Sequence, residues 1–210
     1  MIYHFLNLVC WRDWQKFTDC DDIISLDSRS IVLLGRILGF KNARVLSGVE
    51  KFESLKTGVR ADNYYLLAVN RPEIDQSRQF TLPLFKDLKS VDISSEIMLF
   101  LEKVPIKAQL LIGIASPKQN LLAKQIKEIR PDLDIYCLGA AIYFQSKETR
   151  EQDGYMIKFF NSHLWIQFLR DNPRRTLLKI LVTVIEIIFI IFITEHRNAF
   201  KQFMERANET

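Results

Sequence analysis

Short apolar runs, bounded by polar or turn residues, alternate along the middle of the chain with longer segments of mixed character. Three of these runs are brief and rich in branched or aromatic side chains, as expected of strands buried in a sheet. They are YYLLAV (Tyr64–Val69), LLIGIA (Leu110–Ala115) and DIYCLGAAIYF (Asp134–Phe144). The pattern therefore predicts three buried β-strands.

Between these runs, apolar residues recur at intervals of three and four, the spacing of one face of an α-helix. The segments SSEIMLFLEKV (Ser94–Val104) and KQNLLAKQIKEI (Lys118–Ile129) show this spacing, and SIVLLGRILGF (Ser30–Phe40) is a further candidate helix. Strands that alternate with helices form βαβ units. We therefore predict an α/β domain over residues 1–156, a Rossmann-like, mainly parallel sheet flanked by helices. Such sheets bind ligands at the carboxyl ends of their strands.

Residues 157–210 have a different pattern and predict a C-terminal helical, membrane-associating appendage. The segment TLLKILVTVIEIIFIIFIT (Thr176–Thr194) is almost continuously apolar and is close to the shortest length that spans a bilayer. On a helix, one narrow polar stripe would contain Lys179, Thr183, Glu186 and Ile190. A helix of this kind suits contact with a membrane or docking against protein, and a buried core or oligomer helix is the alternative.

The composition narrows the class of protein. Apolar residues make up 48% of the 210 residues and charged residues 26%, which is typical of a globular chain. The formal net charge of +4 is compatible with an anionic ligand or a membrane surface, and we expect no nucleic-acid partner. Cys10, Cys20 and Cys137 are too scattered for a disulfide framework or a zinc site. No secretory signal is visible, so we expect a cytoplasmic protein.

The sequence Ser-Pro-Lys-Gln separates the predicted strand Leu110–Ala115 from the helix that follows it. Ser116 is expected to accept a hydrogen bond from an early helix amide, and Pro117 suits the first helical position. The unpaired amides would then bind an anionic oxygen, while Lys118 adds a positive charge and Gln119 an amide that can read a hydroxyl or a base. An ordinary capped helix is the simpler interpretation of the same residues.

Three motifs occur in a characteristic order: SPKQ after an apolar strand, then P-x-L-x-I-x-x-x-G-A-A, then W-x(7)-P-R-R. This order resembles the WecG/TagA/CpsF family of bacterial glycosyltransferases, over about residues 7–175. These enzymes move an N-acetylhexosamine, typically N-acetylmannosamine or its uronic acid, from a UDP donor to a polyprenyl-diphosphate-linked sugar. The resemblance implies the same activity here, in cell-surface polysaccharide synthesis at the inner face of the cell membrane.

The resemblance also implies roles for individual residues. The family's Asp-Gly-x-Gly loop contains the proposed general base, and its aspartate matches Asp27 in the sequence DSRS. The substrate-contacting glutamine of the family matches Gln119, and the lysine beside it matches Lys118. Arg44 in RVLSG is similar to the family's Arg-Val-x-Gly, and Asn7 matches a polar residue of the pocket.

Glycosyl transfer needs a base for the acceptor hydroxyl and positive charge for the departing UDP. The Pro-Arg-Arg motif provides Arg174 and Arg175, with Arg170 shortly before it, and the resemblance implies that they bind the diphosphate. A solvated basic stretch, or contact with lipid headgroups alone, is the alternative. We expect metal-independent transfer without a cofactor. The expected partners are a UDP-N-acetylhexosamine, a polyprenyl-diphosphate-linked acceptor and a membrane surface, with a homo-oligomer as a further option.

Several positions depart from the family's pattern. Ser28 and Ser30 replace two glycines, which permit a ligand to approach the backbone closely. The acidic residue and the glycine that usually follow Gly-Ala-Ala are absent, and Phe168 stands where the tryptophan–arginine helix has its arginine. A catalytically inactive relative, acting as a membrane-associated binding or scaffold subunit, is therefore the alternative function. A nucleotide-dependent oxidoreductase is disfavoured because no GxGxxG follows a predicted strand.

Overall fold

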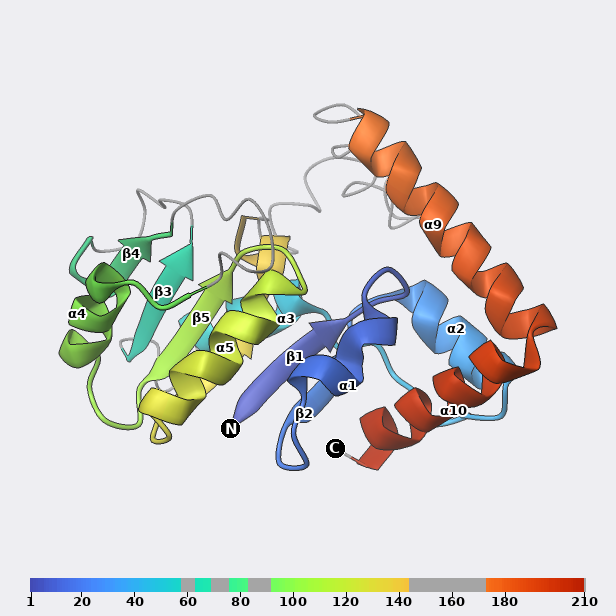
Figure 1. Ribbon diagram of the computed structural model, residues 1–210, viewed down its shortest axis with the longest axis horizontal. Helices are drawn as coiled ribbons and strands as arrows, with labels where there is room; N and C mark the ends of the chain where they lie inside the picture. The colour runs from blue at the N-terminus through green and yellow to red at the C-terminus, as the bar shows by residue number, and fades with distance from the viewer. Residues whose placement is uncertain (58–62, 69–75, 83–91, 144–172, 210) are drawn as a thin grey trace.

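The computed structural model describes residues 1–57, 63–68, 76–82, 92–143 and 173–209 and contains a six-stranded sheet (Figure 1). Its strands are β1 (Ile2–Leu6), β2 (Ile23–Leu26), β3 (Tyr64–Ala68), β4 (Gln79–Thr81), β5 (Gln109–Gly113) and β6 (Asp134–Cys137). Each strand pairs in parallel with its neighbours, in the order β2-β1-β6-β5-β3-β4. The predicted α/β class with a mainly parallel sheet is confirmed.

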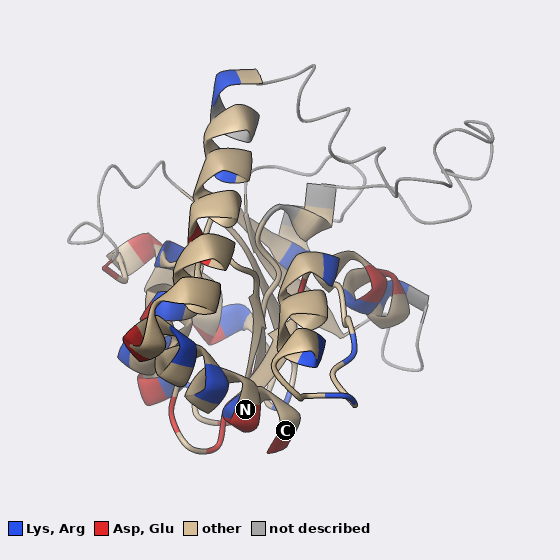
Figure 2. Ribbon diagram, turned by 90° about the vertical axis from the view of Figure 1, so that its right-hand side faces the viewer, with Lys and Arg blue, Asp and Glu red and all other residues tan. Residues whose placement is uncertain are grey.

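Helices flank both faces of this sheet, as the edge-on view in Figure 2 shows. The described helical segments are η1 (Trp11–Asp13), α1 (Trp14–Phe17), α2 (Arg29–Ile37), α3 (Gly48–Thr57), η2 (Gln76–Arg78), α4 (Ser95–Lys103), α5 (Lys118–Ile129), η3 (Gly139–Tyr143), α9 (Pro173–Phe192) and α10 (Thr194–Glu209). Helices α4 and α5 share one apolar cluster with the strands, and α3 and η3 share another on the opposite face.

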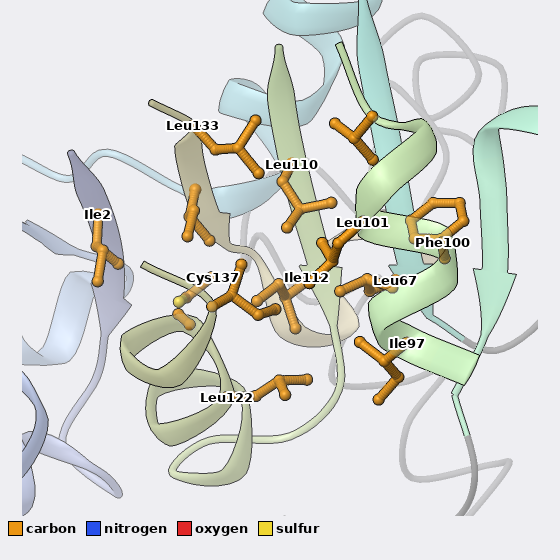
Figure 3. Packing of buried hydrophobic residues seen from close by; sticks show 14 of the residues in the cluster. Ile2, Leu67, Ile97, Phe100, Leu101, Leu110, Ile112, Leu122, Leu133 and Cys137 are labelled. Carbon is orange, nitrogen blue, oxygen red and sulfur yellow. The ribbon is translucent and has the colours of Figure 1, made fainter. Parts of the chain in front are cut away.

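The period of two along the central strands explains these two clusters. Leu110 and Ile112 of β5 point toward α4 and α5, where they pack with residues such as Leu101 and Leu122 (Figure 3). Leu111, between them in the sequence, belongs to the cluster under α3. Because both faces of the sheet are covered, its central strands are mainly apolar on both sides, as is usual for parallel sheets.

Three predicted elements end earlier than the sequence suggests. The strand expected over Leu110–Ala115 is β5, which stops at Gly113; the other two end at a glycine turn. The strand expected over Asp134–Phe144 stops at Cys137, because Gly139 has a φ of +58° and the chain then forms the turn η3. The helix expected over Ser30–Phe40 begins one residue earlier and ends at Ile37. Both turns lie where the chain leaves the regular element through a glycine in the left-handed region.

Helix α10 is part of the protein core. Phe200, Phe203 and Met204 are fully buried, in a cluster that also contains Trp11. The rings of Trp11 and Phe200 meet edge to face, with their centroids 5.1 Å apart. The closest approach is to α2, where a Cβ atom on Gly35 would lie 2.4 Å from the Met204 Cε atom. The C-terminal helix therefore stabilises the part of the sheet that contains β1 and β2.

Helix α9 instead exposes much of its apolar surface. Leu178, Leu181 and Phe192 are 60%, 56% and 76% exposed, whereas Glu186 and Ile190 of the predicted polar stripe are buried. Taken alone, no described helix has both the length and the apolar character of a membrane span; α9 and α10 together do, across a bend of 103°. The helical nature of this region agrees with the sequence prediction. Its contact with a membrane stays a prediction, and the predicted boundary at residue 156 lies outside the described residues.

Candidate active site at the carboxyl ends of the strands

Asp27 directly follows β2 and lies half-buried at the carboxyl edge of the sheet, just before α2. Its backbone amide donates to the carbonyl oxygen of Leu6 over 2.8 Å, and its carboxylate accepts from the Gly48 amide over 2.8 Å. Burial raises the pKa of Asp27 to about 6; the Gly48 amide opposes this shift and the charge of Glu50 adds to it. A carboxyl group with such a pKa can accept a proton near neutral pH.

The loop after β1 forms a neighbouring part of this edge. The amides of Cys10 and Trp11 donate to the Asn7 carbonyl oxygen over 3.1 and 3.0 Å, and the Val9 amide donates to the Asn7 side-chain oxygen over 2.9 Å. Asn7 therefore uses its side-chain oxygen to shape the loop. Burial raises the pKa of the Cys10 thiol to about 11, so this thiol is protonated and unreactive at neutral pH.

Two glycines connect the Asp27 region with the start of α5. Gly48, which bonds the Asp27 carboxylate, lies so close to η3 that a Cβ atom on it would be 3.0 Å from the Ala141 Cβ atom. A Cβ atom on Gly139, at the other end of this contact, would be 3.5 Å from the Gln119 Nε2 atom. The turn η3 therefore lies between Asp27 and Gln119 and holds their loops together.

Gln119 is the second predicted site residue with unusual surroundings. Its side chain is buried, with an exposed fraction of 3%, and its Oε1 atom has no hydrogen-bond partner in the part of the chain that the structure describes. A buried oxygen without a partner is costly unless water or a ligand bonds to it. Asp27 and Asn7, on the loops after β2 and β1, and Gln119, in the first turn of α5, thus lie at one edge of the sheet.

The start of α5 differs from the sequence prediction. Pro117 is the N-cap residue, and Ser116 does not cap the helix: its hydroxyl donates to the Asn120 Oδ1 atom over 2.8 Å. The Gln119 amide bonds the carbonyl oxygen of Ala115 over 3.4 Å, and the Asn120 amide bonds that of Pro117 over 3.0 Å. The predicted anion site is therefore wrong for these two amides, because the turn itself satisfies them.

The predicted basic residues are less tightly grouped. Arg44 is exposed in the segment that joins α2 to α3, and Lys118 is half-buried at the first position of α5. Arg174 is exposed in the first turn of α9, which projects on the side toward which the strands run (Figure 1). Arg170 and the side chain of Arg175 lie outside the described residues.

A buried chain of hydrogen bonds behind this site was not predicted from the sequence. The fully buried His4 of β1 has its Nε2 atom 3.2 Å from the Asp22 Oδ2 atom and its Nδ1 atom 2.7 Å from the Asn120 Nδ2 atom. Asn120, also fully buried, then accepts from the Ser116 hydroxyl. Asp22 also accepts from the Asp19 amide over 2.9 Å. The one signal in the sequence is a lone histidine in the otherwise apolar run IYHFL.

A separate hollow lies at the other end of α2. Its volume is about 540 Å³, and its lining consists of Gly39, Phe40, Lys41, Asn42 and Asn208. None of these residues has a carboxylate, thiol or hydroxyl group. The side chains that suit acid–base chemistry therefore lie at the edge around Asp27 and not in this hollow.

Within the described ranges, no three His, Cys, Asp or Glu side chains gather to bind a metal ion. Metal-independent chemistry stays a prediction. No protein-family model, no curated protein and no solved structure matches the chain. The resemblance to the WecG/TagA/CpsF enzymes therefore rests on the motifs in the sequence.

Proposed function

We propose that this chain is a glycosyltransferase that moves an N-acetylhexosamine, such as N-acetylmannosamine or its uronic acid, from a UDP donor to a polyprenyl-diphosphate-linked sugar. The observation that carries the proposal is the Asp27 carboxyl group, half-buried at the carboxyl edge of a parallel sheet with a pKa raised to about 6. A base whose pKa lies close to the working pH is the most effective proton acceptor. The motif resemblance supplies the reaction class.

In this reaction, Asp27 takes the proton of the acceptor hydroxyl while the hydroxyl oxygen attacks the anomeric carbon of the donor sugar. The bond from that carbon to UDP breaks, and UDP leaves with the electron pair. The buried Gln119 oxygen, which has no partner among the described residues, is suited to accept a hydrogen bond from a sugar hydroxyl or from the N-acetyl N–H group. Arg44, Lys118 and Arg174 supply positive charge for the diphosphate, and the other arginines of the Pro-Arg-Arg region share this role.

We further propose that the exposed face of α9 contacts the inner surface of the cell membrane. Leu178, Leu181 and Phe192 give this face a large apolar area, whereas Arg174 at the start of the helix can reach anionic headgroups. A helix that lies in the interface in this way would bring the neighbouring carboxyl edge of the sheet close to a lipid-linked acceptor. The same contact would then bind the protein to the membrane and place the acceptor near the site.

An inactive binding subunit is the second candidate. Ser28 and Ser30 stand where the related enzymes have glycines, and their hydroxyl oxygens are 3.1 Å apart. Ser28 also caps α2 by accepting from the Ile31 amide over 3.4 Å. These side chains occupy space beside Asp27 that glycines would leave to a ligand, which favours binding without turnover.

Sugar transfer by the purified, full-length protein decides between these functions. The protein is offered a panel of UDP-N-acetylhexosamines and a short polyprenyl-diphosphate-N-acetylglucosamine acceptor. We expect a product, loss of turnover in Asp27→Asn with UDP binding retained, and wild-type turnover in Asp21→Asn, which changes an exposed aspartate at the opposite edge of the sheet. UDP binding without any product would support the inactive subunit, and equal turnover in both variants would remove Asp27 from the mechanism.

A further inference from the structure

We propose that Asp22, His4 and Asn120 form a buried positioning relay that fixes the Ser116 hydroxyl as a hydrogen-bond acceptor toward the ligand. The proposal concerns four residues that are distant in the sequence and lie in one unbroken chain of hydrogen bonds. Its ligand part rests on the proposed UDP-sugar binding, whereas its structural part does not.

The direction of every hydrogen bond in the relay follows from Asp22. Its carboxylate can only accept, so the His4 Nε2 atom must carry the proton that bridges their separation of 3.2 Å. In a neutral imidazole the Nδ1 atom then has no proton and accepts. The atom that meets it at 2.7 Å must therefore be the amide nitrogen of Asn120, which is a donor.

This orientation of Asn120 determines the state of Ser116. With its nitrogen turned toward His4, the Asn120 side chain presents its Oδ1 atom to the Ser116 hydroxyl, 2.8 Å away. The hydroxyl proton is thereby committed to Asn120, and the Ser116 oxygen keeps only lone pairs for other partners. All donors along the relay point toward Asp22, so the three hydrogen bonds reinforce one another.

Burial keeps the relay in this arrangement. His4 and Asn120 are fully buried and Asp22 is 5% exposed, so water does not offer alternative partners. The Oδ2 atom of Asp22 that faces His4 also accepts from the Asp19 amide, over 2.9 Å. Because an amide side chain stands between His4 and Ser116, the relay orients the hydroxyl and does not transfer its proton.

The inference identifies the ligand group that Ser116 can bind. Ser116 is half-buried, and its hydroxyl is also a hydrogen-bond partner of the Cys10 side chain, in the loop after β1. The oxygen has two lone pairs, so one remains for a ligand when the other faces the Cys10 thiol. An oxygen that has only lone pairs repels a phosphate oxygen and accepts from an O–H or N–H group. The Ser116 oxygen should therefore contact a hydrogen-bond donor of the UDP-sugar, on the sugar or on the nucleoside, and not the diphosphate.

The relay itself is tested by the nitrogen chemical shifts of His4 in ¹⁵N-labelled, full-length protein at neutral pH. The His4 signals are assigned by their disappearance in His4→Gln. We expect a protonated Nε2 atom and an unprotonated Nδ1 atom. The opposite tautomer, or protonation of both nitrogens, would overturn the proposed orientation whether or not UDP binds.

The ligand part is tested by the affinities of UDP and of UDP-N-acetylglucosamine for four variants. Ser116→Ala removes the acceptor and should weaken binding about three- to tenfold, whereas Ser116→Thr should retain it. His4→Gln keeps a donor for Asp22 and an acceptor for Asn120 and should also retain binding. His4→Leu breaks the relay and should lose as much affinity as Ser116→Ala.

The two ligands distinguish the source of the donor. Equal weakening for both ligands by Ser116→Ala places the donor group on the nucleoside, and weakening for the UDP-sugar alone places it on the sugar; either result supports the proposal. Unchanged affinity for both overturns it, and so does equal loss in Ser116→Thr and Ser116→Ala. If the wild-type protein binds neither ligand, the proposed function fails with the ligand part, and the His4 tautomer still decides the relay.

Discussion

Helices α5 and α9 each have an apolar side and a polar side, but only α5 turns its widest apolar side toward the protein. In α5, Leu122 and Ile126 are fully buried against the sheet. In α9, Glu186 is buried, while Leu178 and Leu181 are 60% and 56% exposed. Figure 2 shows the result as a long, mostly uncharged helix along one side of the molecule.

The difference lies in what each helix meets. Helix α5 packs on apolar strands, whereas the inward side of α9 meets two hydrogen-bond donors of η1. The Glu186 carboxylate accepts from the Trp11 Nε1 atom over 3.2 Å and from the Arg12 Nε atom over 2.8 Å. Once its carboxylate is turned inward, the wide apolar side of α9 must face outward. An apolar surface of this extent marks a contact with another apolar phase or partner, which supports the membrane contact that we propose.

The sharpest way to test this comparison is to place one charge on each apolar face. Leu122→Asp in α5 buries an unpaired carboxylate and should lower the free energy of unfolding by more than about 4 kcal/mol, or prevent folding. Leu181→Asp in α9 changes an exposed side chain and should alter it by at most about 0.5 kcal/mol. Urea unfolding of the two variants measures both values, and a large loss in Leu181→Asp would show that α9 is covered by protein.

The same Leu181→Asp variant should lose membrane affinity. A carboxylate on the face that meets the lipid opposes insertion, so the partition coefficient onto vesicles of mixed zwitterionic and anionic phospholipid should fall about tenfold. Co-flotation with the vesicles measures this coefficient. The matched control is Leu33→Asp, which changes an exposed leucine of α2. Equal binding by the wild-type protein and both variants would exclude α9 as the membrane contact.

The inward side of α9 is tested by Glu186→Ala. This change leaves the buried indole N–H of Trp11 without its acceptor and removes the partner of Arg12, so the free energy of unfolding should fall by about 1–3 kcal/mol. Glu186→Gln keeps an acceptor oxygen and should recover part of this loss. The control Glu205→Ala removes an exposed carboxylate of α10 and should have little effect. Thermal or urea unfolding that gives the same value for Glu186→Ala and Glu205→Ala would contradict the inward orientation.

The two helices also show how far the sequence predicts the fold. The spacing in Lys118–Ile129 predicts α5 with the bounds that the structure has, because its apolar face matches an apolar sheet. The same reasoning finds the polar stripe of α9, but not its direction. A period of 3.6 states which residues share a side of a helix, and it does not state which side meets the protein. That direction depends on Trp11 and Arg12, which are about 170 residues away in the sequence.

The candidate site, like the two helices, is predicted from the sequence only in part. The motifs predict Asp27 and Gln119 as site residues. The structure places Asp27 in the loop after β2 and Gln119 in the first turn of α5, both at the carboxyl edge of the sheet. The strands β1 and β2 were not predicted, because His4 and Ser25 interrupt runs of only four or five residues. The relay through Asn120 therefore could not be predicted from the sequence either, since its members meet only when β1, β2 and α5 are assembled.

The smallest effect we predict concerns Asp27 and stability, and its sign distinguishes this carboxylate from a structural one. Burial raises the pKa of Asp27 to about 6, above its ordinary value of 3.8, so the folded state binds more protons than the unfolded state between these values. Stability from this group is thus fully present below pH 3.8 and is lost as the pH rises to about 6. Asp27→Asn has no carboxyl group at this position, so it does not lose this stability as the pH rises.

Asp27→Asn should therefore be more stable than the wild-type protein at pH 7.5, by about 1–2 kcal/mol, and of nearly equal stability at pH 4. Urea unfolding at the two pH values measures this difference, and the exposed Asp21→Asn serves as the control. The asparagine oxygen can still accept from the Gly48 amide, so the gain comes from removing a poorly solvated charge. A variant that gains stability and loses sugar transfer would show that the carboxylate is kept in this position for chemistry, at the expense of the fold. A difference that does not change with pH would instead mean that the charge of Asp27 is well solvated, and would remove the main physical support for its role as the base.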